Sequence, residues 1–200
     1  MLAGQTMVDS DGYEVALFPM ENLHLSQGEH QLYALDFLGW GANGRIRNYP
    51  VYAPFTGRVV YTGNDHNIIF QSDDKVHFVD GTVDYATVLM AHSETDVPLM
   101  GAFFKQGTLL YHTGDYGNSQ GDHLHMEVAK GHVRWDIGGL HLKDPYHMWD
   151  MFAVNDTVIS AGMGLDWQEF EDGITPTNFK AHKFNWSVFS RKLKKSYLKR

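Results

Sequence analysis

The sequence predicts a mainly β protein, built from antiparallel strands in a sandwich or a partly closed barrel. Short runs of β-branched and aromatic residues recur at intervals of roughly 8–12 residues, and Gly, Asp and Asn turn signals separate them. A hydrophobic content of 43% is sufficient for a core, and the chain has no cysteine that could form a disulfide. A length of 200 residues suits one domain, or one domain with an appendage.

The predicted strands follow one another through the first two thirds of the chain. They cover residues 13–18, 33–38, 51–61 (strand, turn and strand), 67–71, 75–79, 85–92, 101–111 and 124–128. Residues 39–48 are expected to form a loop, because Gly39, Gly41 and Gly44 interrupt the pattern.

The composition changes after about residue 140. Asp144 is expected to cap a short helix that begins at Pro145, and residues 155–180 have a loop-like composition. Asn185 is expected to cap a final amphipathic helix, with Trp186 on its apolar stripe. We therefore expect a main domain over residues 1–150 and a mixed or helical C-terminal extension over residues 151–200.

Charge is unevenly distributed. Residues 181–200 carry seven basic side chains and no acidic one, and subtracting this +7 from the net charge of −8 leaves −15 for residues 1–180. The acidic body argues against nucleic acid as the main partner. The basic end predicts either a solvated helix face or a contact with an anionic cell wall or another protein, such as a virion component. Neither a membrane span nor a secretory signal peptide is expected.

The most informative motif is His123-Leu124-His125, at the start of the last strand predicted in the main domain. Polar and apolar residues alternate here with period two, which predicts a half-buried strand. Residues two apart on a strand share a face, so the two imidazoles should emerge together, with backbones roughly 7 Å apart. Leu124 should face a core. Two such histidines provide half of a metal-centred site.

Upstream residues complete a candidate metal site. His30 and Asp36 flank the strand at residues 33–37, and imidazole and carboxylate are the zinc ligands available to a protein without cysteine. With His125 they make two His and one Asp, which leaves a fourth tetrahedral position open, as in catalytic zinc sites. His92 ends another predicted strand and should lie near this site with His123. His24 is the reserve candidate for His30.

This set of residues resembles the lysostaphin-type zinc endopeptidases, which cleave peptide bonds of bacterial peptidoglycan. The resemblance covers residues 15–150, including the predicted hairpin at residues 51–60 and the run Gly121-Asp-His-Leu-His-Met-Glu-Val. It implies the lysostaphin-type fold, with His30, Asp36 and His125 as zinc ligands and His92 and His123 as catalytic residues. The first pair is six residues apart here and often four apart in that family. A longer spacing occurs in D-Ala-D-Ala carboxypeptidase relatives, but those enzymes end in a Glu-x-x-His element, and none is suitably placed here.

The small size and the expected lack of a signal peptide favour a phage product, made in the host cytoplasm or carried in the virion, that acts on the cell wall as an endolysin or a tail-associated enzyme. A bacterial origin is the alternative. One alternative is an inactive wall-binding or virion structural module with the same fold, although all five site positions are filled. A second is a mononuclear iron oxygenase or cupin, since two His and one carboxylate also suit Fe(II). Glu127 is expected to support the site or to be solvated. The aromatic residues Trp40, Tyr61 and Tyr116 either line a groove or pack in the core.

Overall fold

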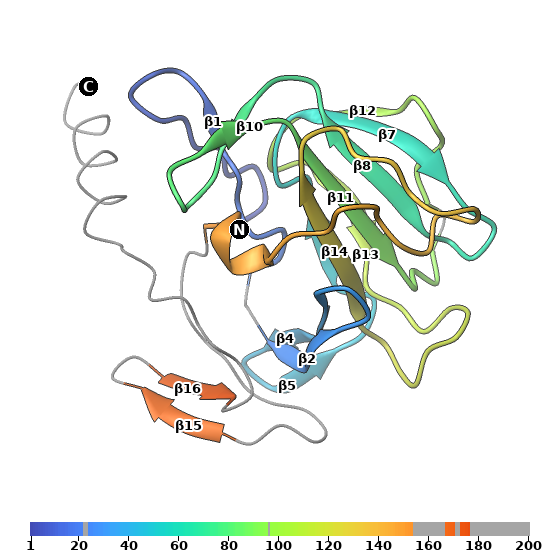
Figure 1. Cartoon of the computed structure of the whole chain (residues 1–200). Coiled ribbons are helices and arrows are strands. Elements are labelled where there is room, and N and C mark those ends of the chain that lie inside the picture. Colours follow the sequence, from blue (N-terminus) through green and yellow to red (C-terminus); the bar gives the residue numbers. More distant parts are fainter. Residues whose placement is uncertain (22–23, 96, 154–166, 171–172, 177–200) are drawn as a thin grey trace.

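A seven-stranded antiparallel sheet is the centre of the computed structural model, which describes residues 1–21, 24–95, 97–153, 167–170 and 173–176 (Figure 1). The strand order is β12-β7-β8-β11-β14-β3-β2. The bounds of these strands are β2 Leu25–His30, β3 Ala34–Phe37, β7 Gly57–Thr62, β8 Ile68–Ser72, β11 Ala86–Ala91, β12 Phe103–Phe104 and β14 Leu124–Lys130. The prediction of a mainly β, antiparallel fold is confirmed.

Smaller sheets surround the central one. Their strands are β1 Glu14–Val15, β9 Val76–His77 and β10 Val83–Asp84 in one sheet, β6 Pro50–Tyr52 with β13 Leu109–His112, β4 Gly39–Gly41 with β5 Gly44–Ile46, and β15 Trp167–Phe170 with β16 Gly173–Pro176. The pair β1–β9 is parallel, and the other pairs are antiparallel. The expected hairpin at residues 51–60 is different in the structure, because β6 pairs with β13 and β7 pairs with β8 and β12.

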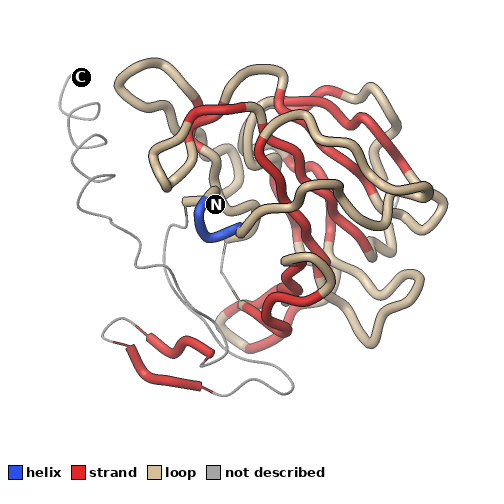
Figure 2. Tube along the Cα trace, in the orientation of Figure 1, coloured by secondary structure: helices blue, strands red, loops and turns tan. Residues whose placement is uncertain are grey.

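The main core lies on one face of the central sheet, where alternate strand residues meet the β6–β13 pair. Val88, Met126 and Val128 of the sheet share this core with Val51 and Leu110, and all five are buried. The prediction that the apolar residues of the last strand face a core is confirmed. Figure 2 shows strands joined by loops throughout this body, and the described helix is confined to one short turn.

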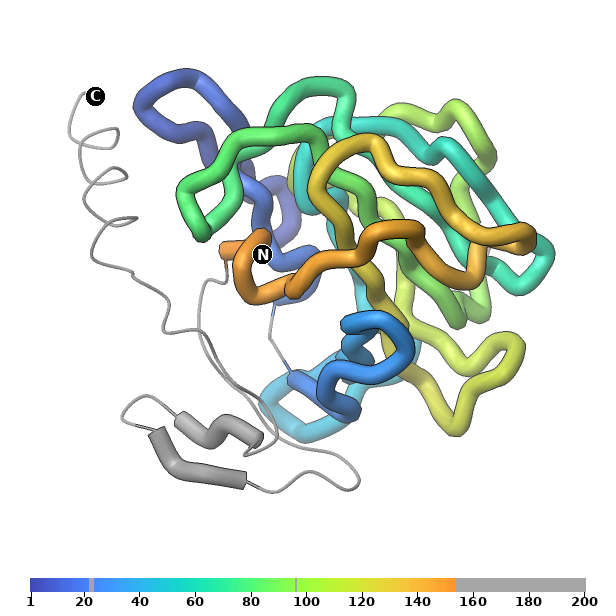
Figure 3. Tube along the Cα trace, in the orientation of Figure 1, coloured from blue at the N-terminus to red at the C-terminus, as the bar shows by residue number. Residues whose placement is uncertain are grey.

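A second apolar layer covers the opposite face of the central strands. The chain after β14, coloured gold to orange in Figure 3, folds back across the sheet. Leu142 from this segment is buried with Ile69 and Leu89, and Trp135 packs against them. As a result β14 is buried on both faces through Ala129, including Glu127. The expectation of a half-buried strand is therefore wrong, because alternation alone does not reveal this returning segment.

Two local predictions are wrong for identifiable reasons. Residues 39–48 contain the β4–β5 hairpin instead of an unpaired loop, and Asn43-Gly44 is a turn signal that suits it, with Gly44 at φ 102°. Asp144 does not cap a helix, because its φ is 55°, and a 3-10 turn at Met148–Asp150 begins after His147 instead.

The structure describes two short strands of the C-terminal extension expected at residues 151–200. Part of the segment expected to be loop-like forms the antiparallel pair β15–β16. The neighbouring Asp172-Gly173 is a hairpin signal in the sequence that this expectation overlooked. The final helix capped by Asn185 lies outside the described residues. Among the residues that are described, no helix has the length and hydrophobicity needed to cross a lipid bilayer.

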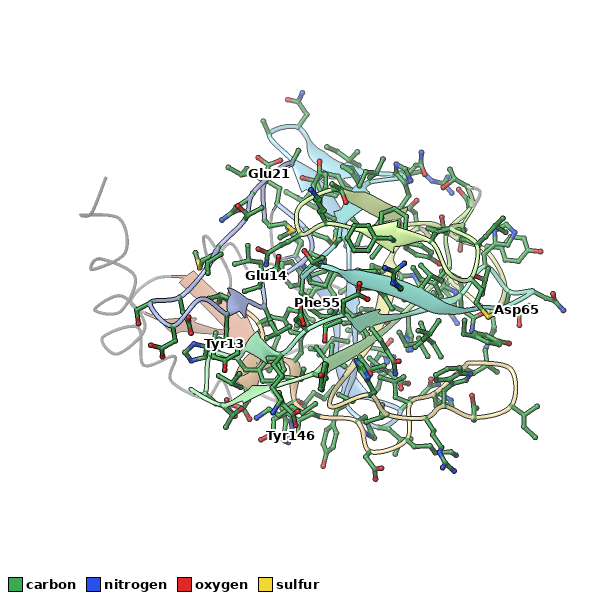
Figure 4. All side chains as sticks on the ribbon, turned by 90° about the horizontal axis from the view of Figure 1, so that it is seen from above. Tyr13, Glu14, Glu21, Phe55, Asp65 and Tyr146 are labelled. Atoms are coloured by element: carbon green, nitrogen blue, oxygen red, sulfur yellow. The ribbon has the colours of Figure 1, made fainter. Side chains whose placement is uncertain are left out.

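The N-terminal strand is fastened to the body by a carboxylate. The two carboxylate oxygens of Glu14 accept hydrogen bonds from the backbone N–H and the hydroxyl of Thr56, both at 2.6 Å. Glu14 and Phe55, both labelled in Figure 4, lie on the two segments that this contact joins. Asp65 lies at the opposite end of the molecule from Tyr13 in that view.

Candidate metal centre and active site

Neighbouring strands bring the candidate residues to one end of the central sheet. In the antiparallel register, His125 on β14 is the direct partner of Asp36 on β3, and of Ala91 on β11 from the other side. His30 ends β2 beside the start of β3. His92 follows β11 by one residue, and His123 precedes β14 by one residue. The strand order β11-β14-β3-β2 is therefore what assembles the site.

The three proposed metal ligands converge on a common point. Nδ1 of His125 lies 3.0 Å from Oδ1 of Asp36, and Nε2 of His30 lies 3.6 Å from the same oxygen. Donor atoms of these three residues all lie within 4.8 Å of one another. Asp36 and His125 are buried, at 7% exposure each, and His30 is partly buried. The sequence analysis grouped these three residues in one site, and the structure brings their side chains together.

The two proposed catalytic histidines lie beside this cluster. Nε2 of His123 is 3.7 Å from Oδ2 of Asp36. The ring centroids of His92 and His123 are 4.6 Å apart, and those of His92 and His125 are 5.7 Å apart. All five residues predicted for the site therefore occupy one region.

Backbone carbonyls set the tautomers of three of these histidines. The Nδ1 N–H of His30 donates to the Gly28 carbonyl at 2.9 Å. That of His123 donates to the Gly121 carbonyl at 2.7 Å, and that of His92 to the Tyr116 carbonyl at 2.9 Å. A neutral imidazole whose Nδ1 carries the proton has its lone pair on Nε2. The Nε2 atom of each ring is thus free to bind a metal or to accept a proton.

His92 adopts an unusual backbone conformation that a neighbouring loop supports. Its φ is 79°, in the left-handed region that non-glycine residues rarely adopt. The Tyr116 N–H donates to the His92 carbonyl at 3.1 Å, while the Tyr116 carbonyl accepts from the His92 ring. A Cβ at Gly114 would lie 2.2 Å from the His92 carbonyl oxygen, so only glycine fits there. Gly114 also pairs with His123, which joins both histidines to one loop.

A tight turn explains how a spacing of six residues still produces a ligand pair. Gln31, Leu32 and Tyr33 all have positive φ, at 37°, 66° and 67°, and they turn the chain from His30 into β3. Each left-handed residue costs roughly 1–2 kcal/mol. The Tyr33 ring packs 4.2 Å from the ring of His147, whose Nδ1 donates to Glu29 at 2.6 Å. These contacts hold the turn against the body.

Burial and neighbouring charges shift the pKa values of the site residues in different directions. Burial alone would raise the pKa of Asp36, but the hydrogen bond from His125 and the nearby histidines lower it. Burial would lower the pKa of His125, but the carboxylates of Asp36 and Glu127 outweigh it and raise that pKa to about 9. Burial lowers the pKa of His92, only partly opposed by its bond to Tyr116, which favours a neutral ring.

The donor set fits a zinc ion. Zinc binds imidazole nitrogen at about 2.0–2.1 Å and carboxylate oxygen at about 2.0–2.2 Å, so two of its ligand atoms lie within roughly 4 Å of each other. The 3.0 Å and 3.6 Å separations around Asp36 meet this condition. Two nitrogens and one oxygen also form the donor set of catalytic zinc sites with an open position.

Several other predictions have clear outcomes. The reserve ligand His24 is buried and stacks on Trp40, with ring centroids 3.8 Å apart, and it is not among the grouped donors. Tyr61 packs with the second apolar layer. Tyr116 stacks on His66 at 3.9 Å, half exposed, beside His92.

Of the two roles expected for Glu127, the solvated one is wrong, and its partner His141 escaped the sequence-based prediction. Glu127 is buried behind His125, and His141 is its partner. Nδ1 of His141 lies 2.7 Å from Oε1 of Glu127. Period-two alternation placed Glu127 on the histidine face, but no sequence signal points to His141.

An antiparallel fold with two His and one Asp around one point has the architecture of a mononuclear metal centre. Residues 41–137 match the family model described as "Peptidase family M23", and this part of the chain is a domain of that family, the lysostaphin type. The match includes His92, His123 and His125. His30 and Asp36 precede the matched residues, so their assignment to the site rests on the geometry.

A phage protein is similar to most of the chain. The chain is 33% identical over 186 residues to "Morphogenesis protein 1" of Bacillus phage B103. The aligned region covers 84% of this chain and 48% of the phage protein. The chain thus spans about half the length of this curated relative.

Solved structures with similarity to the chain include lysostaphin from Staphylococcus simulans, with 19% identity, a TM-score of 0.43, and coverage of 62% of this chain and 48% of the other. A putative peptidase M23 from Pseudomonas aeruginosa has 21% identity, a TM-score of 0.42, and coverage of 64% and 49%.

Proposed function

We propose that this protein is a zinc-dependent endopeptidase that hydrolyses peptide bonds of bacterial peptidoglycan, in the cross-bridge or the stem peptide. The observation that carries the proposal is the convergence of His30, Asp36 and His125 beside the free Nε2 atoms of His92 and His123. The match to peptidase family M23 supports peptidase chemistry. The resemblance to the lysostaphin type supports peptidoglycan as the substrate.

The three ligand residues would hold the metal, and the other two histidines would handle the protons and the developing charge. A zinc ion at His30, Asp36 and His125 would supply a Lewis acid and a source of hydroxide near neutral pH. His123 would accept the proton of the attacking water on Nε2, and the proton would then go to the nitrogen that leaves when the C–N bond breaks. His92, with its lowered pKa, would orient the water or hydrogen-bond the developing oxyanion.

The test is hydrolysis of purified peptidoglycan from several bacteria by the zinc-loaded protein. Turbidity should fall and new amino groups should appear with the wild type and not with His123→Ala. Mass spectrometry of the fragments identifies the bond. If both proteins bind zinc and neither releases amines from any wall, the enzyme proposal fails in favour of a wall-binding or structural module. Iron instead of zinc in the purified protein would favour the oxygenase alternative.

We further propose a phage origin and a place in the virion for this enzyme. The supporting observation is the 33% identical relative, whose name refers to morphogenesis, and this favours a virion-associated enzyme over an endolysin. Antibodies against the protein should then detect it in purified virions. Detection only in the lysate would support the endolysin reading.

The basic C-terminal segment, outside the described residues, is proposed as a contact with cell-wall polyanions or a virion protein. Replacement of Lys192, Lys194 and Lys195 by Gln should weaken co-sedimentation with cell walls at low salt. Unchanged binding would leave these lysines as a solvated face.

A further inference from the structure

The second ring nitrogen of His125 faces a buried carboxylate. Nε2 of His125 lies 3.9 Å from Oε1 of Glu127, while its Nδ1 faces Asp36 on the other side at 3.0 Å. The Glu127 side chain is fully buried. A carboxylate is costly to bury unless it has hydrogen-bond donors or a cation around it.

The donors that hold Glu127 come from the segment that returns across the sheet. Nδ1 of His141 donates to Oε1 at 2.7 Å, and the backbone N–H of Leu142 donates to Oε2 at 2.8 Å. The carboxylate of Asp136 accepts from the N–H groups of Leu140 and His141, which fixes the turn. His141 is half exposed, so a chain of three side chains runs from solvent to the metal centre.

The orientation of His125 sets it apart from the other site histidines. His30, His92 and His123 present Nε2 to the site because a carbonyl holds their Nδ1 proton. His125 presents Nδ1 instead, at Asp36. A metal bound at Nδ1 needs the lone pair of that atom, so the ring proton must lie on Nε2, which faces Glu127.

We propose that Glu127, oriented by His141, is a positioning residue that holds His125 with its proton on Nε2 and its Nδ1 lone pair directed into the metal site. The inference rests on the proposed zinc function and concerns residues outside the five assigned there. Carboxylates that accept the free N–H of a ligand histidine fix its tautomer and orientation, and their loss typically weakens metal binding 10–100-fold.

The test measures zinc affinity by competition with a chelating dye, together with thermal melting of the metal-free protein. Glu127→Gln should weaken zinc binding about 10–100-fold. His141→Ala should weaken it less. His141→Asn should restore most of the loss, because the Asn amide nitrogen can take the place of Nδ1. Asp9→Asn is the matched control, since it removes another buried carboxylate–imidazole pair, at 2.5 Å from His77, without a contact at the metal centre.

Each outcome decides one question. The inference is overturned if a folded Glu127→Gln protein binds zinc as tightly as the wild type. It is also overturned if His141→Asn and His141→Ala lose the same amount of zinc affinity. If Glu127→Gln does not fold, the ¹⁵N shifts of His125 in the zinc-loaded wild type decide instead, with a proton on Nε2 expected and a proton on Nδ1 overturning the proposal. Failure of the unaltered protein to bind zinc defeats the proposed function itself, and is seen before any variant is made.

Discussion

His125 and Asp36 are direct partners across the β14–β3 pair, with Nδ1 of one 3.0 Å from Oδ1 of the other. They are 89 residues apart in the sequence. Both are buried, and the antiparallel register fixes their separation more tightly than a loop could. This pair is the rigid half of the proposed metal centre, while His30 joins it from the turn beside β3.

Substitution of either partner should remove the metal. His125→Ala and Asp36→Ala should each reduce bound zinc from about one equivalent to background, because three protein ligands are the usual minimum of a catalytic zinc site. Elemental analysis after gel filtration measures this. His132→Ala, which alters a histidine bonded to the Ser72 carbonyl away from the site, serves as control. Full zinc content in the Asp36 variant would show that the ligand set is different.

His123→Ala should separate metal binding from catalysis. Loss of a general base typically costs about 10²–10⁴-fold in rate, while the zinc ligands stay intact. The measurement pairs zinc content with kcat/KM on a soluble peptide substrate. If zinc is lost together with activity, His123 is a ligand and the assignment of His30 must be revisited.

Gly114→Ala should disturb both proposed catalytic histidines at once. The added Cβ would lie 2.2 Å from the His92 carbonyl oxygen and 2.4 Å from the Glu94 nitrogen, so the backbone must move. Activity should fall at least tenfold with zinc still bound, since none of the three proposed ligands lies in that loop. Asn118→Ala, an exposed position in the same loop, should behave as wild type. Equal activity of the two variants would argue against a fixed position for His92.

The Asp9–His77 pair should contribute stability that depends on pH. Burial would raise the pKa of Asp9, but hydrogen bonds from His77 and from the Asp11 and Tyr13 N–H groups lower it below its usual value of about 3.9. A lowered folded-state pKa stabilises the fold above the unfolded pKa, and this stabilisation is lost as the pH falls through the folded value. Asp9→Asn should therefore cost about 1–3 kcal/mol near neutral pH.

Thermal melting between pH 3 and pH 7 measures this difference. The gap between wild type and Asp9→Asn should be largest at pH 6–7 and should shrink below about pH 4. A gap that stays constant over the whole range would mean that packing, and not the ionised carboxylate, accounts for the loss.

The sequence was most informative where spacing and residue chemistry coincide. The alternation around His123 and His125 predicted that they lie close together, and the structure places His125 in β14 and His123 one residue before it. The His and Asp residues upstream were the zinc donors available without cysteine. Turn signals between short strands predicted the antiparallel class. These inferences are local, because they depend on periodicity within a strand and on the chemistry of individual side chains.

Other features depend on contacts between distant segments. The second buried face of β14 exists because residues after Lys130 return across the sheet, and no local pattern encodes that path. The same return places His141 against Glu127. The left-handed turn at residues 31–33 was also invisible, since Gln, Leu and Tyr have no preference for positive φ. Asp144 misled the helix prediction because its backbone takes a positive φ of 55°, and the only helical turn in the described residues begins after His147.

The strand order has a consequence for when the proposed metal centre can form. Asp36 is made early in synthesis, but it meets His125 only after β14 has emerged and paired with β3. Contacts so far apart in sequence form slowly, because the loop between them must first be closed, and an unfolded chain rarely holds a metal site in advance. A nascent or truncated chain that ends before residue 125 therefore lacks one of the three proposed metal ligands and the strand that holds it. The topology therefore couples the formation of the proposed metal centre to the completion of the sheet.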